Sequence, residues 1–267
     1  MHYTRVLDQL HQRLLPRHYL EIGVQHGRTL ALALPCTAAV GIDPAPSIEA
    51  AIGDATVVAA TSDDFFARPD CASLLEPLDL AFIDGMHWYE FALRDFMNIE
   101  SHSHRDTVVA VHDCLPTNPA MAGRVQQPGP GAWTGDVWKL VAVLRRARPD
   151  LTVDIVDAEP SGLALITGLD RANTVLRDSY DDILAAFDPL GFDVLEPDPH
   201  VSLNAVADVD FATLPGPNQD ADREALLRAR ASRRPTVQAR VRSTRRRARA
   251  TPAGTILRRA RRGLGAR

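Results

Sequence analysis

The sequence is poor in lysine, in cysteine and in long apolar runs. Lys139 is the one lysine among 267 residues, so the basic side chains are almost all arginines, a bias that coding composition alone can produce. The three cysteines form an odd set without a C-x-x-C spacing, which indicates neither a disulfide framework nor a zinc site. No run approaches about 18 apolar residues, and the N-terminus has no apolar segment of signal-peptide length. We therefore expect a cytoplasmic protein.

Positive charge is concentrated at one end of the chain. Residues 223–267 hold 16 arginines and one acidic residue, whereas residues 1–222 hold 14 basic and 33 acidic side chains. The basic segment has little apolar content, so we predict a disordered tail. Such a tail could contact an anionic lipid or nucleic-acid surface and bring the protein to a membrane, or it could reflect only the bias toward arginine. We predict a folded domain over 1–190, a Pro- and Asp-rich extension over 191–222 and the tail over 223–267.

Short apolar runs alternate with helix-like segments along the folded part. Five runs are predicted to be buried strands: "HYLEIGV", "AAVGIDP", "ATVVAATS", "LDLAFIDG" and "DTVVAVHD". Helices are predicted over about 3–15, 28–34, 89–102, 137–148 and 174–187, and two further strands in "LTVDIVDAEPSGLALITGL". Continuous apolar strands separated by helices are typical of an α/β fold, with a mostly parallel sheet covered on both faces.

A glycine turn follows the first strand, and acidic residues end the next two. The turn reads Glu21-Ile22-Gly23-Val24-Gln25-His26-Gly27, and Asp43 ends the second strand 20 residues after Gly23. In an open parallel sheet, ligands lie beyond the carboxyl ends of the strands. The glycines allow close backbone approach, and Asp43 could accept the hydroxyls of a ribose. Alternatively, the glycines form an ordinary turn and Asp43 is a helix N-cap. Ser62 and Asp63, near the end of the third strand, would lie near an adenine edge.

The fourth and fifth strands end in a second group of polar residues. Asp84 ends "AFID", His87 follows three residues later, and His112 and Asp113 end the fifth strand. If these strand ends are adjacent, two carboxylates and an imidazole meet, a set that suits Mg²⁺ and admits Mn²⁺ or Zn²⁺. His87 could serve as a general base near neutral pH. The alternatives are a turn at Asp84-Gly85 and structural histidines.

The E-x-G-x-x-x-G turn with Asp43 resembles the S-adenosylmethionine site of class I methyltransferases. Asp84-x-x-His87 with His112-Asp113 resembles the metal-dependent O-methyltransferases of the catechol, macrolide-sugar and rhamnosyl type, over about residues 18–170. The resemblance implies a Rossmann-like, doubly wound sheet of seven strands with an antiparallel last strand, within the domain over 1–190. It also implies that Asp84, His112 and Asp113 are metal ligands, that His87 is the base, and that the cofactor contacts Glu21, Gly23, Gly27, Asp43, Ser62 and Asp63. His112 departs from the family pattern, which has an acid or amide there, so its ligation stays open.

The function implied is methyl transfer from S-adenosylmethionine to a hydroxyl of a small molecule or glycan, assisted by a divalent metal. Acceptor contacts would come mainly from the loop over 115–135, the N-terminal helix and residues 188–222, and homo-oligomers are common for such enzymes. One alternative is a nucleic-acid methyltransferase that uses the tail for phosphate contacts. Its amino-directed forms usually carry N/D-P-P-Y/F where this sequence has "IDGMH". Another is a non-catalytic, Rossmann-like binding protein tethered by the tail.

Overall fold

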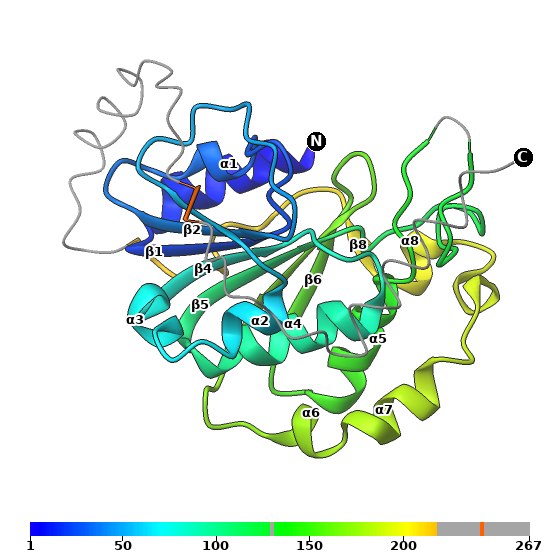
Figure 1. Ribbon diagram of the computed structural model, residues 1–267. Coiled ribbons are helices and arrows are strands. Elements are labelled where there is room, and N and C mark those ends of the chain that lie inside the picture. Colours follow the sequence, from blue (N-terminus) through cyan, green and yellow to red (C-terminus); the bar gives the residue numbers. More distant parts are fainter. Residues whose placement is uncertain (129–130, 218–240, 243–267) are drawn as a thin grey trace, which may run out of the picture.

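The computed structural model describes residues 1–128, 131–217 and 241–242 and shows one mixed sheet between two layers of helices (Figure 1). The strand order is β8-β6-β7-β5-β4-β1-β2-β3-β9. Among the strands described, β7 alone runs antiparallel to its neighbours. The predicted seven-stranded Rossmann-like sheet with an antiparallel last strand is therefore confirmed. Two edge strands of two residues each, β8 and β9, were not predicted.

The elements follow the chain in this order: α1 (Tyr3–Leu14), β1 (His18–Ile22), η1 (Leu30–Leu32), β2 (Ala38–Asp43), β3 (Thr56–Ala59), α2 (Ser62–Phe66), α3 (Cys71–Leu75), β4 (Leu78–Ile83), α4 (Tyr89–Ser101), β5 (Ser103–His112), α5 (Trp138–Ala147), β6 (Thr152–Val156), β7 (Leu163–Thr167), α6 (Val175–Asp178), α7 (Tyr180–Phe187), η2 (Phe192–Leu195), α8 (Pro199–Ser202), β8 (Ala205–Val206) and β9 (Val241–Arg242). No helix in these described segments is long and apolar enough to cross a membrane.

The sheet buries a separate apolar core on each face. In β1, Leu20 and Ile22 face the core under α2–α5 and α7, whereas Tyr19 faces the core under α1 and η1. Figure 1 shows α1 on one side of the sheet and α2, α4 and α5 on the other. Because alternate residues of a strand point to opposite faces, a strand buried on both faces reads as a continuous apolar run. This explains why the strands could be recognised from the sequence.

Three predicted elements differ from the structure. The helix expected over 174–187 is divided at Ser179 into α6 and α7. The helix expected over 28–34 is only the three-residue η1, because Ala33 already has an extended ψ of 139° and Leu34 precedes Pro35. A residue before proline disfavours the helical conformation. The third strand ends at Ala59, before Ser62, because the Thr61 side chain accepts a hydrogen bond from the Asp64 N–H at 3.1 Å and begins α2.

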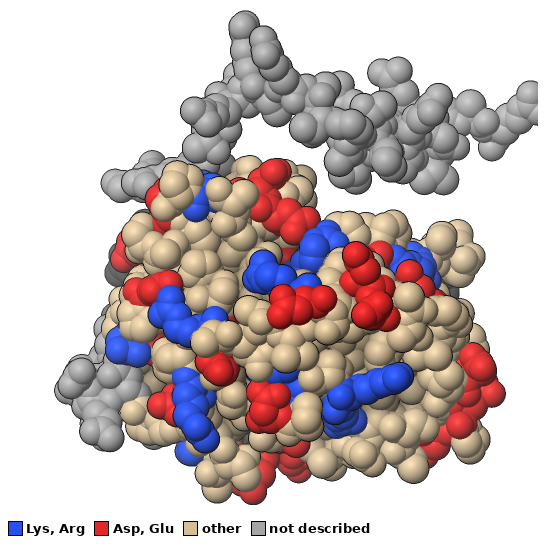
Figure 2. Space-filling model, turned by 90° about the horizontal axis from the view of Figure 1, so that it is seen from below, with Lys and Arg blue, Asp and Glu red and all other residues tan. Residues whose placement is uncertain are grey.

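The predicted boundaries at 190 and 222 stay a prediction. Residues of the expected extension form η2, α8 and β8, which pairs with β6 at the sheet edge. The expected tail lies outside the described residues except for the two residues of β9. On the face of the molecule beneath α2, α4 and α5, basic and acidic side chains of the described residues are interspersed (Figure 2).

Candidate active site

The turn after β1 is packed directly onto the end of β4. The chain begins in the middle of the sheet, runs outward through β2 and β3 and returns to β4 beside β1, so the strand order reverses between β1 and β4. Gly23 has φ +89°, and its N–H donates to the Ile42 carbonyl at 2.8 Å. A side chain on Gly23 would place its Cβ 2.0 Å from the Asp84 carbonyl oxygen. Glycine is therefore required here, and the turn lies where ligands bind in open α/β sheets.

Asp43 holds this turn from the neighbouring strand. Its Oδ2 accepts the N–H groups of Val24 at 3.1 Å and Gln25 at 2.8 Å, and its Oδ1 accepts the Ala45 N–H at 2.7 Å. Gly27 ends the turn with φ +74°, and a Cβ there would meet the Ile52 side chain at 2.9 Å. Asp43 stays half-buried. The structure thus brings together the predicted glycines and acid and shows that Asp43 stabilises the turn, while its contact with a ribose stays a prediction.

Glu21 lies on the α1 face of β1 and is fully buried. Tyr19 and Thr29 donate hydroxyl hydrogen bonds to its two carboxylate oxygens, at 2.7 and 2.8 Å. Burial raises the pKa of Glu21 to about 8, although these hydrogen bonds oppose the shift. In this structure Glu21 therefore fastens β1 to the segment that follows the glycine turn.

Ser62 and Asp63 begin α2, which packs against α4. Asp63 forms an ion pair with Arg94 at 3.0 Å. Ser62 lies beside Asp95, whose pKa burial raises to about 7 against the opposing hydrogen bond with Ser62. The contact of Ser62 and Asp63 with an adenine edge stays a prediction.

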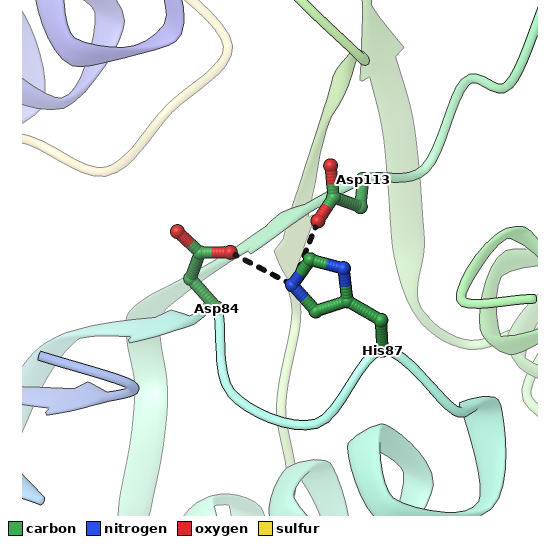
Figure 3. A group of neighbouring side chains, drawn as sticks. All are labelled: Asp84, His87 and Asp113. Atoms are coloured by element: carbon green, nitrogen blue, oxygen red, sulfur yellow. Dashed lines mark ion pairs between the residues drawn. The ribbon is translucent and has the colours of Figure 1, made fainter. Parts of the chain in front are cut away.

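Asp84, His87 and Asp113 meet beyond the ends of β4 and β5 (Figure 3). These strands are neighbours and run parallel, so their carboxyl ends lie side by side. His87 Nε2 lies 3.2 Å from Asp113 Oδ2 and 3.8 Å from Asp84 Oδ1. One ligand atom from each of the three residues lies within 4.8 Å of the others. The convergence expected from the sequence is therefore present.

The opposite side of the His87 ring is fixed by the loop before α5. His87 Nδ1 lies 2.8 Å from the Trp133 carbonyl oxygen, and the Trp133 ring stacks on the imidazole at 4.8 Å between centroids. A carbonyl only accepts, so Nδ1 carries the hydrogen and Nε2 is directed at the carboxylates. A Cβ on Gly135, which has φ +55°, would lie 1.7 Å from the His87 carbonyl oxygen.

His112 lies beside both carboxylates. Its Nδ1 is 3.3 Å from Asp84 Oδ1 and 3.4 Å from Asp113 Oδ1, and the Tyr3 ring covers the imidazole at 4.0 Å between centroids. Burial lowers the pKa of His112, but hydrogen bonds and charge from Asp113 and Asp84 outweigh it and raise the pKa to about 10. Burial raises the pKa of Asp84, whereas His112 and His87 hold the pKa of Asp113 low in spite of burial.

Ser161 and Tyr3 are site residues that sequence reasoning missed. The buried Ser161 hydroxyl lies 2.5 Å from Asp113 Oδ1 and 3.2 Å from His112 Nε2. Tyr3, in α1, has its pKa raised to about 12 by burial and by the charges of Asp84, Glu21 and Asp113. Ser161 lies next to Gly162 in a turn, where a serine is common and does not indicate a functional site. Its place beside Asp113 becomes clear only from the pairing of β5 with β7.

The donor atoms fit a divalent cation. Two carboxylates and one imidazole nitrogen suit Mn²⁺ or Zn²⁺, and the carboxylates alone suit Mg²⁺ with water or substrate oxygens. Figure 3 shows His87 Nε2 turned toward an oxygen of each aspartate. The imidazole and the two carboxylates therefore share one centre.

One known protein family matches the part of the chain that holds this site. The family described as "Methyltransferase domain" matches residues 20–114, which contain part of β1, the whole of β2 to β5 and every predicted site residue. This stretch of the chain is therefore similar to methyltransferase domains, in agreement with the class I methyltransferase prediction. No curated protein matches the sequence.

Several solved structures match part of this chain. The O-methyltransferase TomG of tomaymycin synthesis from Streptomyces achromogenes, solved with SAM, is 19% identical, with a TM-score of 0.43 over 63% of this chain and 80% of its own. An O-methyltransferase from Bacillus cereus, solved with SAH, is 13% identical, with a TM-score of 0.40 over 62% and 80%. The SAH-bound methyltransferase PaMTH1 from Podospora anserina is 14% identical, with a TM-score of 0.45 over 63% and 78%. At these values the substrates of the neighbours say nothing about this chain.

Proposed function

We propose that this methyltransferase domain transfers a methyl group from S-adenosylmethionine to a hydroxyl of a small molecule or sugar, with a divalent metal held by Asp84 and Asp113. The observation that carries the proposal is the convergence of Asp84, His87 and Asp113 beside the glycine turn. Because Gly23 lies against the main chain of Asp84, a cofactor on the turn would have its reactive end next to the carboxylates. The acceptor, the oligomeric state and any contact of the tail stay predictions.

The cofactor site has the chemistry that the ligand needs. The half-buried Asp43 carboxylate beside the turn can accept ribose hydroxyls with its remaining lone pairs, since each oxygen can accept more than one hydrogen bond. We propose Glu21, Gly23, Gly27, Ser62 and Asp63 as the rest of this site. When bound, the cofactor would supply an electrophilic methyl on sulfur.

His87 is the proposed general base. His87 Nε2 would accept the proton of the acceptor hydroxyl, while the acceptor oxygen would take the methyl group that the bound cofactor supplies. The hydrogen bond of Nδ1 to the Trp133 carbonyl leaves Nε2 as the nitrogen that accepts this proton. A divalent ion between the carboxylates would lower the pKa of the acceptor hydroxyl and orient it. His112 is the third predicted ligand, and its contacts with both aspartates support a place beside the ion.

Calorimetry with S-adenosylhomocysteine and a screen of hydroxyl acceptors would test the proposal. We expect binding in EDTA, and methyl transfer only after Mg²⁺ or Mn²⁺ is added. Asp84→Asn should retain cofactor binding and lose metal-stimulated transfer. Absence of cofactor binding would refute the methyltransferase activity, whereas transfer that is unaffected by chelation would refute the metal alone.

A further inference from the structure

We propose that Ser161 is a positioning residue that orients Asp113 and His112, so that Asp113 faces His87 and the metal with Oδ2 alone; this inference rests on the proposed function. Ser161 lies in the turn between β6 and β7 and is 2% exposed. Its hydroxyl oxygen contacts Asp113 Oδ1 at 2.5 Å and His112 Nε2 at 3.2 Å. It is therefore in contact with two residues of the site.

The donors and acceptors fix the direction of both hydrogen bonds. A carboxylate only accepts, so the single Ser161 hydrogen is donated to Asp113 Oδ1. The Ser161 oxygen must then accept the N–H of His112 Nε2. With Nε2 bound to Ser161, the Nδ1 side of the ring is the side that faces Asp84 Oδ1 and Asp113 Oδ1. One hydroxyl thus sets the orientation of the imidazole.

The same hydroxyl determines which oxygen of Asp113 is available. Oδ1 receives the Ser161 hydrogen, while Oδ2 lies 3.2 Å from His87 Nε2. Because Oδ1 faces both the Ser161 hydroxyl and His112 Nδ1, its two lone pairs are directed at these partners, and Oδ2 is the oxygen left for a metal. Partners of this kind behind a ligand typically contribute about 10–100-fold to metal affinity.

The main chain around Ser161 is held firmly enough for this role. The Ser161 carbonyl accepts the Leu115 N–H at 2.7 Å, and the Gly162 N–H donates to the Ala158 carbonyl at 2.7 Å. Asp113 has φ +63°, in the left-handed region that non-glycine residues seldom adopt. Ser161 therefore contacts this segment twice. Its side chain binds the Asp113 carboxylate, and its carbonyl binds the N–H of Leu115, two residues after Asp113.

The test is Mn²⁺ titration of the full chain, followed by electron paramagnetic resonance of the free ion, with S-adenosylhomocysteine calorimetry in parallel. Ser161→Ala should weaken Mn²⁺ binding by about 10–100-fold and leave cofactor binding unchanged. Ser161→Thr keeps the hydroxyl and should restore the affinity for Mn²⁺. If Ser161→Ala does not fold, Ser161→Cys takes its place, because a thiol of similar shape donates only weakly.

Ser103→Ala is the matched control. Ser103 is also 2% exposed, but its hydroxyl donates to the Ile99 carbonyl at 2.8 Å at the opposite end of β5, so Mn²⁺ affinity should not change. Equal Mn²⁺ affinity in the wild type and Ser161→Ala would overturn the role of Ser161 alone. A wild type that binds the cofactor but no Mn²⁺ would overturn the proposed metal site and this inference together.

Discussion

The main chains of Gly23 and Asp84 are in direct contact, with the position of a Gly23 Cβ only 2.0 Å from the Asp84 carbonyl oxygen. The Asp84 N–H also donates to the Ile22 carbonyl at 2.8 Å. The glycine turn and the main chain of the proposed metal ligand are therefore parts of one backbone junction between β1 and β4.

Gly23→Ala should disrupt this junction. The added methyl group meets main-chain atoms that cannot rotate away, and φ +89° is unfavourable for alanine, so we expect a loss of about 2–4 kcal/mol in the free energy of unfolding. Urea denaturation measures the loss. Gly216→Ala is the control, because no atom lies within 4 Å of its Cβ position. Equal stability of the two variants would contradict the contact.

Asp43→Ala should weaken binding of S-adenosylhomocysteine at least about tenfold, as expected when hydrogen bonds to a charged group are lost. The variant also frees the N–H groups of Val24 and Gln25, so part of the loss reflects a less ordered turn. The exposed Asp54→Ala is the control, because it also removes one negative charge but lies outside the turn. Calorimetry on both variants separates the loss of a cofactor contact from the effect of net charge. Unchanged affinity in Asp43→Ala would remove Asp43 from the cofactor site.

His87→Ala should lower kcat by about 10²–10⁴-fold and leave S-adenosylhomocysteine affinity unchanged, because it removes the proposed proton acceptor. Mn²⁺ affinity, measured on the same variant, distinguishes the two roles that the geometry allows. If His87 is only the base, the Kd of the variant for Mn²⁺ should stay near the wild-type value. If His87 is a metal ligand, its loss should raise that Kd strongly. A variant with wild-type kcat would exclude the role of base, and one that also kept the wild-type Kd for Mn²⁺ would exclude both roles.

Glu21 should make stability depend on pH. Its pKa is raised to about 8 in the folded state, above its ordinary value of 4.5, so the folded state keeps a proton that the unfolded state loses. The stabilisation is complete below about pH 4.5 and is lost as the pH rises toward 8, by at most about 1.4 kcal/mol per pH unit. Denaturation at pH 5 to 8 should show a smaller decline in Glu21→Gln than in the wild type. Parallel pH profiles would contradict the raised pKa.

The sequence predicted the parts of the site that depend on strand ends. Asp84 and Asp113 end neighbouring parallel strands, so the periodicity that identifies β4 and β5 also brings their carboxylates together. Ser161 could not be found in this way, because it follows Asp113 by 48 residues and reaches it only through the antiparallel pairing of Leu163 with His112. The contact of His87 with the Trp133 carbonyl joins residues 46 positions apart in the sequence, and Trp133 lies in the irregular loop between β5 and α5, where no periodic pattern exists to place it.

The loop before α5 holds the proposed base mainly through its backbone. The Trp133 carbonyl contacts His87 Nδ1, the Asp136 N–H donates to the His87 carbonyl at 3.3 Å, and Gly135 fits against the same carbonyl. Backbone contacts do not depend on which side chains the loop carries, apart from the glycine. Loop positions other than Trp133, whose ring stacks on the imidazole, and Gly135 can therefore be substituted while the imidazole keeps its orientation, which makes them the positions to randomise in an engineered library.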